Sequence, residues 1–266
     1  MVSRVCTLVD LPPLIVPLVT PYTDDGSTVS EIRIARMVRW HKEQGAGGFM
    51  VGSDAGEPGS LSLNERKQAL EWIMREVGDL PVYVNITGMT TAYTIDLAQD
   101  ANESGAYAGI LTPPPWGGLT PEETQAFLSA VRRHGGLACG WIDPTGHTSG
   151  QAEMIHAPGR KNPGLLSEHG FEHLATMPHG TNYEFWSPSG LIHPAGLFGA
   201  EKGAAMLEKW AAFKPVLSGL LKLAGPARVG KYVFESIGFE FGPLRGPYMP
   251  LSPQGREIAD HLLRAV

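Results

Sequence analysis

The stretch GAGGFMVGSDAGEPGSLSLNERKQ, residues 45–68, decides the fold. Within it, the short apolar run at 47–53 predicts a buried strand that leads into a glycine-rich loop. The following residues, 61–77, place apolar side chains at helical spacing. Ser62 is a suitable N-cap for this helix, and Glu65 three residues later completes a capping box. A strand, a tight loop and a helix form the repeating unit of parallel α/β folds.

The same unit recurs along the first half of the chain. Further apolar runs predict strands at 14–20, 81–86, 107–115 and 137–144. Apolar side chains at helical spacing predict helices at 29–44, 90–105 and 120–136. Five strands that alternate with helices predict a parallel sheet covered by helices.

The composition argues against several classes of protein. The chain has 266 residues and a net charge of −6, and it has no basic block of the kind that binds nucleic acid. No run of about 18 apolar residues occurs, and the N-terminus lacks a small-residue cleavage pattern, so we expect neither a membrane span nor a signal peptide. The two cysteines, Cys6 and Cys139, lie far apart. This argues against a disulfide framework and favours a cytoplasmic location.

Three passages resemble the dihydrodipicolinate synthase / N-acetylneuraminate lyase family. They are VPLVTPYTDDGSTV (16–29), the stretch at 45–68, and GKYVFESIGFEFGPLRGPYMPLSPQGREIADHLL (230–263). The resemblance implies an α/β fold, a (β/α)8 TIM barrel with C-terminal helices. It also implies a small-molecule substrate and a homo-oligomer, either a dimer or a tetramer.

The later units of this barrel are predicted to be abridged. Between 145 and 199 only 55 residues remain for three units, about 18 each, against about 31 in a typical barrel of about 250 residues. Helical periodicity returns at 201–224, 226–237 and 253–265. We therefore expect a barrel over residues 1–224, irregular at 145–199, and a C-terminal helical tail at 225–266 packed on it.

The residues that carry the family's chemistry are replaced in this chain. In the family, a lysine on the sixth strand forms a Schiff base with a 2-oxo acid, usually pyruvate, and a tyrosine on the fifth strand moves protons. The lysine is expected near 174–180, where this chain has none, and the nearest is Lys161 in a loop-like context. The tyrosine position falls on Trp141, whose indole can donate a hydrogen bond but cannot act as an acid or base near neutral pH.

The family's Gly-Thr-Thr-Gly-Glu loop is also changed. Its threonine pair, which holds the substrate carboxylate in the family, falls on Asp54 and Ala55, while Gly56 and Glu57 remain. Two carboxylates in one low-dielectric pocket repel each other unless a cation or proton intervenes. Either the ligand is not a simple 2-oxo acid, or Asp54 is protonated, or a metal bridges the two. The alternative is that Asp54 turns outward or caps the loop.

Histidines gather in the later part of the chain. Six of the nine lie between 147 and 193, without the spacing of a metal motif. His179 follows a predicted sixth strand, and catalytic residues of barrels lie at such strand ends. The predicted catalytic residues are Asp54, Glu57, His147 and His179. The predicted substrate-binding residues are Ser53, Asn85, Thr112, Trp141, Asp143 and Tyr183. We predict no cofactor and assign no metal ligand, although a divalent metal stays open.

Three functions stay open on this basis. The leading hypothesis is a lyase-type enzyme in which a histidine and a carboxylate replace Schiff-base catalysis with acid/base chemistry. The second is a non-catalytic binding or structural relic of the family. The third is a metal-dependent aldolase, in which a divalent ion held by side chains among Asp54, Glu57, Asp143, His147 and His179 polarises the substrate carbonyl.

Overall fold

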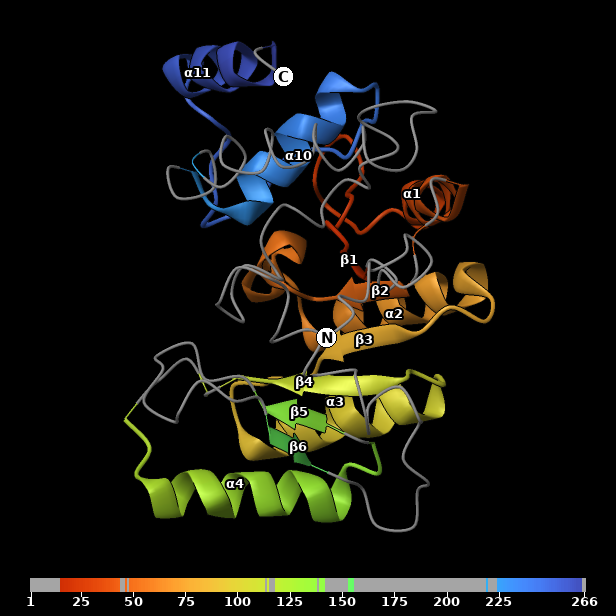
Figure 1. Cartoon of the computed structure of the whole chain (residues 1–266), viewed down its shortest axis with the longest axis vertical. Coiled ribbons are helices and arrows are strands. Elements are labelled where there is room, and N and C mark those ends of the chain that lie inside the picture. Colours follow the sequence, from red (N-terminus) through yellow and green to blue (C-terminus); the bar gives the residue numbers. More distant parts are fainter. Residues whose placement is uncertain are drawn as a thin grey trace, which may run out of the picture.

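The structure is a computed structural model, and it describes residues 15–43, 46, 48–112, 114, 118–137, 139–141, 153–155, 219 and 224–264. Short strands alternate with helices through the first half of this part (Figure 1). In chain order the elements are β1 (Ile15–Pro17), α1 (Glu31–Glu43), β2 (Gly48–Val51), η2 (Asp54–Gly56), η3 (Pro58–Ser60), α2 (Leu63–Val77), β3 (Val82–Asn85), α3 (Thr91–Glu103), β4 (Ala108–Leu111), α4 (Pro121–His134), β5 (Cys139–Trp141), β6 (Glu153–Ile155), α10 (Pro226–Ser236) and α11 (Pro253–Arg264).

The sheet confirms the predicted strand order. Strands β1 to β5 are neighbours in chain order, and each pair is parallel. The predicted capping box at the start of α2 is also present, because the Glu65 backbone N–H donates to Ser62 Oγ at 3.2 Å while the Ser62 N–H donates to Glu65 Oε2 at 3.0 Å. The start of α2 is therefore fixed by local sequence.

One strand departs from the prediction of a barrel built of parallel strands only. Strand β6 is antiparallel to β5. Only residues 142–152 separate the two strands, and a parallel crossover needs about a dozen residues or more. A connection of this length is short for a parallel crossover and sufficient for an antiparallel return. Apart from β6, residues 142–218 lie outside the described residues. Nearly all of the helix predicted at 201–224 lies outside them as well.

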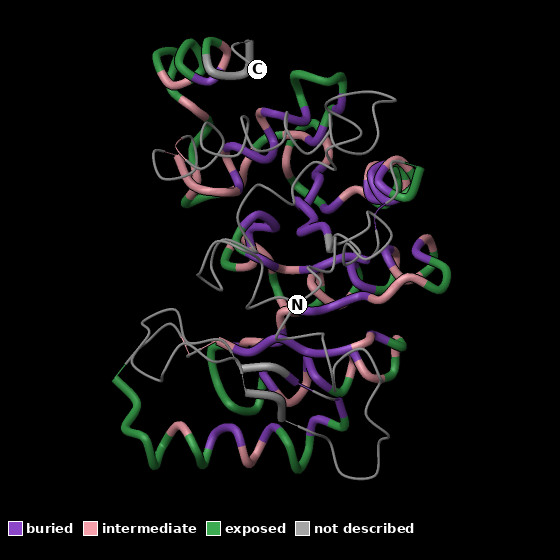
Figure 2. Tube along the Cα trace, viewed as in Figure 1, coloured by how far each residue is buried: buried purple, intermediate pink, exposed green. Residues whose placement is uncertain are grey.

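The core lies between the sheet and its helices (Figure 2). Its largest fully buried side chains include Phe49 of β2, Met37 of α1 and Leu70 of α2. Helix α1 packs beside α2, and α3 packs beside α4. The packing of the helices against the sheet therefore fixes the positions of the strand ends.

No helix in the described residues is both long and apolar enough to cross a membrane.

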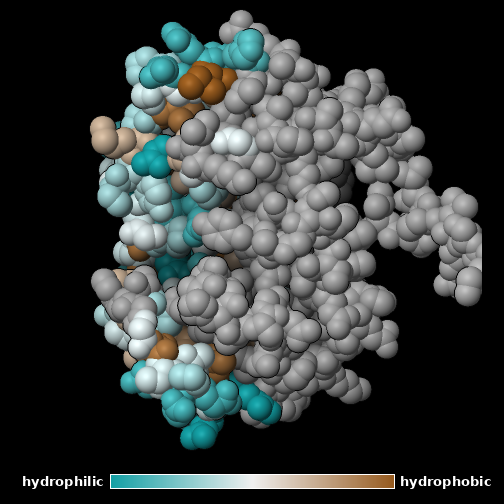
Figure 3. Space-filling model, turned by 60° about the vertical axis from the view of Figure 1, so that its left-hand side comes forward, coloured by the Kyte–Doolittle hydropathy of each residue, from teal (hydrophilic) through white to brown (hydrophobic). Residues whose placement is uncertain are grey.

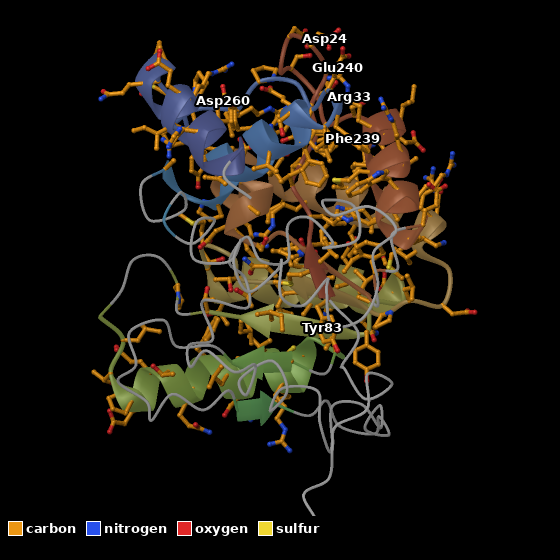
Figure 4. All side chains as sticks on the ribbon, turned by 45° about the horizontal axis from the view of Figure 1, so that its top comes forward. Asp24, Arg33, Tyr83, Phe239, Glu240 and Asp260 are labelled. Carbon is orange, nitrogen blue, oxygen red and sulfur yellow. The ribbon has the colours of Figure 1, made fainter. Side chains whose placement is uncertain are left out.

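The C-terminal tail packs against the N-terminal half of the chain. Phe234 of α10 lies edge-on to Phe241, at 4.9 Å between ring centroids, and to Trp40 of α1, at 5.9 Å. Arg33 of α1 forms an ion pair with Asp24, and its guanidinium lies 3.9 Å from the Glu240 carboxylate in the segment after α10. Figure 4 labels the three side chains, which lie near one another. Helices α10 and α11 thus lie at the end of the molecule opposite α4 (Figure 1).

Candidate functional site

The candidate site is the edge of the sheet at which the parallel strands end. Residues that follow β2, β3 and β4 meet there, because parallel strands share one carboxyl edge. Asn85, the last residue of β3, donates through Nδ2 to Gly52 O at 2.8 Å and so joins the ends of β2 and β3. Thr87 Oγ1 lies 3.1 Å from Thr112 Oγ1 and joins the ends of β3 and β4.

Arg66 of α2 supports this edge from the helix layer. Its guanidinium donates to Asn85 O at 2.5 Å and to Thr87 O at 2.8 Å. Burial lowers the pKa of Arg66 to about 10, so the group stays charged at neutral pH. A partly buried cation held by backbone carbonyls fixes the turn that carries Asn85 and Thr87.

The loop after β2 consists of two 3-10 turns, η2 and η3, joined at Glu57. Glu57 has φ 54° and ψ 49°, in the left-handed region that residues other than glycine rarely adopt. Gly52 at the start of the loop has φ +73°, and a Cβ there would lie 3.4 Å from Asn85 Cβ. Thr20 Oγ1 donates to Gly56 O at 2.6 Å and fixes the turn to the residues after β1.

Glu57 points beneath this loop, where its side chain is fully buried. Its Oε1 lies 2.8 Å from Lys231 Nζ of α10, and its Oε2 accepts from the Arg245 N–H at 3.0 Å. Lys231 Nζ also donates to Pro243 O at 3.0 Å. Both oxygens of the predicted catalytic carboxylate are therefore engaged by the C-terminal tail.

Asp54 belongs to the same loop and, unlike Glu57, is exposed. It is close enough to Tyr248 to act on it electrostatically. The pKa of Tyr248 is raised first by burial and then by the negative charges of Asp54 and Glu57. The loop therefore separates two carboxylates of different accessibility, with Glu57 inside and Asp54 outside.

The structure describes only some of the remaining predicted site residues. Ser53 is 4% exposed, and its hydroxyl has no hydrogen-bond partner among the described residues. Trp141 ends β5 as predicted. Asp143, His147, His179 and Tyr183 lie outside the described residues. The structure thus gathers Ser53, Asp54, Glu57, Asn85 and Thr112 at one edge, and their roles stay predictions.

Sequence reasoning missed the residues that support the site. Lys231, Arg245 and Arg66 were not singled out. One signal was present, because Lys231 lies three to four residues from Ala227 and Phe234, on the buried face of its helix. A lysine on such a face is rarely buried without a charged partner.

Comparisons with known proteins agree with this architecture, which is that of a TIM-barrel protein. Residues 10–139 match the Dihydrodipicolinate synthetase family. The 4-hydroxy-tetrahydrodipicolinate synthase of Agrobacterium fabrum (strain C58) is 33% identical over 115 residues, 43% of this chain and 39% of that protein. The one from Thermoanaerobacter sp. (strain X514) is 24% identical over 120 residues, 45% of this chain and 40% of that protein. The matched stretch therefore spans about 40% of the length of these curated relatives.

Solved structures extend the likeness of fold to nearly the whole chain. Dihydrodipicolinate synthase DapA-2 from Bacillus anthracis has a TM-score of 0.71 at 16% identity, covering 96% of this chain and 99% of its own. The N-acetylneuraminate lyase of Proteus mirabilis has a TM-score of 0.64 at 19% identity, with the same coverage of both chains. The predicted fold class and the predicted resemblance to the dihydrodipicolinate synthase / N-acetylneuraminate lyase family are confirmed.

Proposed function

We propose that the chain is an enzyme of the lyase or aldolase type that acts on a small oxo-acid-like or related polar substrate without a lysine Schiff base. The observation that carries this proposal is the absence of lysine from residues 162–201. That stretch includes 174–180, where the resemblance places the lysine that forms the imine. An imine cannot form without a neutral, accessible amine.

The lysines in the described residues do not supply a substitute. Lys42 Nζ donates to Glu76 O at 2.7 Å, and Lys67 Nζ lies 2.8 Å from Asp96 Oδ2. Lys231 is 3% exposed. Burial lowers its pKa, while the Glu57 carboxylate acts in the opposite direction. A lysine enclosed in this way offers no approach for a substrate carbonyl.

Acid/base chemistry at the strand-end edge would replace the imine. Asp54 takes the proton from the carbon next to the substrate carbonyl. The electron pair of that C–H bond stays on the substrate and is delocalised onto the carbonyl oxygen, which gives an enolate. The enolate carbon then bonds to an aldehyde carbon, and the new alkoxide takes its proton from His179 or His147; cleavage is the reverse. The hydroxyls of Thr87 and Thr112 share one hydrogen bond, so one of their two hydroxyl protons remains to be donated to the enolate oxygen. Such proton transfers typically contribute about 10²–10⁴-fold in rate.

Borohydride trapping tests the absence of an imine. The protein is incubated with pyruvate, reduced with borohydride, and measured by intact mass and peptide mapping. We expect no added mass of reduced pyruvate. A covalent adduct on any lysine, Lys161 and Lys231 included, would overturn the proposal.

Binding without catalysis is the second candidate function. It is favoured by the buried state of Glu57, which makes one of the four predicted catalytic groups inaccessible. Measurable proton exchange on a bound oxo acid would exclude it.

A metal-dependent aldolase remains a third proposal. Within the described residues no three His, Cys, Asp or Glu side chains are grouped as metal ligands, but Asp143, His147 and His179 lie outside them. If a divalent ion is required, EDTA will abolish proton exchange on an oxo acid and added metal will restore it.

We also propose that the protein is a cytoplasmic homo-oligomer. Apolar side chains are exposed near the start of α3 and α4, with Met89 46% and Leu119 39% exposed. Figure 3 shows hydrophobic surface, in brown, toward the lower end of the molecule, where α4 lies in Figure 1. Light scattering at micromolar concentration tests the assembly, and a strictly monomeric species would contradict it.

A further inference from the structure

We propose that Lys231 of the C-terminal tail is a positioning residue of the candidate site, which holds the loop 52–60 and through it the Asp54 carboxylate. The role assigned to Asp54 rests on the proposed function. The anchoring of the loop does not depend on it.

Lys231 reaches the loop from α10 through the Glu57 side chain. Its Nζ lies 2.8 Å from Glu57 Oε1, 3.0 Å from Pro243 O and 4.1 Å from the centroid of the Tyr22 ring. These three partners come from the loop after β2, from the tail itself and from the segment after β1. One ammonium group thus joins three segments that are distant in sequence.

Arg245 completes the anchor on the other oxygen of Glu57. Its backbone N–H donates to Glu57 Oε2 at 3.0 Å. Its guanidinium is held by Glu65 Oε1 of α2 at 2.6 Å and lies 4.3 Å from the Tyr22 ring centroid. The fully buried Tyr22 ring therefore contacts both cations, an arrangement that favours positive charge at each position.

The backbone of the loop explains why a side-chain anchor is needed. Glu57 holds a left-handed conformation that is unfavourable for a residue with a Cβ and persists only when its surroundings enforce it. Its own N–H lies 3.5 Å from Asp54 O, at the limit of hydrogen bonding. Backbone bonds from the Gly56 N–H to Ser53 O at 2.8 Å and from the Ser60 N–H to Glu57 O at 2.9 Å hold each turn. The carboxylate contacts tie the junction between η2 and η3 to the tail. Asp54 begins η2, so its direction depends on the same contacts.

The alternative is that Lys231 anchors the tail and has no effect on the site. Two measurements separate these roles. Hydrogen–deuterium exchange of the peptide covering 52–60 reports the loop directly. Exchange of the C3 protons of pyruvate in D2O, followed by NMR, reports the proposed chemistry.

Lys231→Met is the main variant, and Lys67→Met, which removes a lysine from the surface ion pair with Asp96, is its matched control. We expect Lys231→Met to raise amide exchange in 52–60 at least tenfold while β2 stays protected, and to lower pyruvate proton exchange at least tenfold. Lys67→Met should change neither. Unchanged amide exchange in 52–60, or loosened loop amides with wild-type proton exchange, would overturn the proposal.

A second variant tests the same inference if Lys231→Met does not fold. The double change Glu57→Gly/Lys231→Met removes both charges and places at 57 a residue that adopts the left-handed conformation without strain. We expect it to fold and still to lose protection in 52–60. Wild-type protection there would overturn the inference. If the unmodified protein shows no proton exchange on pyruvate, the proposed function fails, and the loop amides alone then decide the role of Lys231.

Discussion

Lys231 Nζ and Glu57 Oε1 form a buried ion pair at 2.8 Å, between side chains that are 4% and 0% exposed. Removing one partner leaves an uncompensated buried charge, which typically costs about 3–5 kcal/mol, whereas removing both costs much less. We predict that Lys231→Met lowers the free energy of unfolding by about 3 kcal/mol or more, and that Glu57→Leu/Lys231→Met recovers most of this loss. Urea denaturation of both single variants and the double variant measures the coupling. Purely additive losses would contradict the pairing.

We predict that Asp25 contributes to the loss of stability of the fold at low pH. The pKa of its carboxyl is lowered from the usual 3.8 to about 2, first by the hydrogen bond from the Thr23 hydroxyl and then by those from Ser27. A pKa that is lower in the folded state stabilises the fold above the ordinary pKa, and this stabilisation is lost as pH falls through the folded value. Between pH 5 and about 2, the melting temperature of Asp25→Asn should therefore fall less than that of the parent. Parallel curves for the two proteins would show that Asp25 makes no such contribution.

We predict a smaller loss of stability when the Thr20 hydroxyl is removed. Its hydroxyl donates to Gly56 O at 2.6 Å in a buried setting. Thr20→Val keeps the shape but leaves that carbonyl without its donor, at a typical cost of about 1–3 kcal/mol. The measurement is again urea denaturation, with the exposed Thr91→Val as control. Equal stability of the Thr20 variant and the parent would mean that another group satisfies Gly56 O.

The sequence was sufficient for the elements whose signals are local. The Ser62–Glu65 capping box and the helical spacing of apolar residues set the limits of α2, and the other helices of the first half follow in the same way. The environment of Glu57 was not predictable, because its partner Arg245 lies 188 residues away. No short-range pattern encodes such a contact. Strand β6 at Glu153–Ile155 was not predicted at all, because the resemblance placed the sixth strand near 174–180, which lies outside the described residues. The resemblance also implied parallel strands, whereas β6 is antiparallel to β5.

The sequence therefore predicted the positions of these residues in the fold more fully than their chemical roles. Ser53, Asp54, Asn85 and Thr112 end or follow strands that were recognised from apolar runs, so their meeting at one edge follows from the parallel sheet. That Asp54 is exposed while Glu57 is buried depends on the left-handed backbone at position 57 and on the tail beneath it. Those determinants are tertiary, and the sequence of the loop alone does not contain them.

The measurement that tests the account most directly is exchange of the C3 protons of pyruvate in D2O by the parent and by Asp54→Asn. The asparagine keeps the shape of the side chain and removes the base. Because Asp54 is exposed, we expect its melting temperature to stay close to that of the parent. The account predicts exchange by the parent and a loss of about 10²-fold or more in the variant. Exchange by Asp54→Asn at the parent's rate, or no exchange by the parent at all, would contradict it.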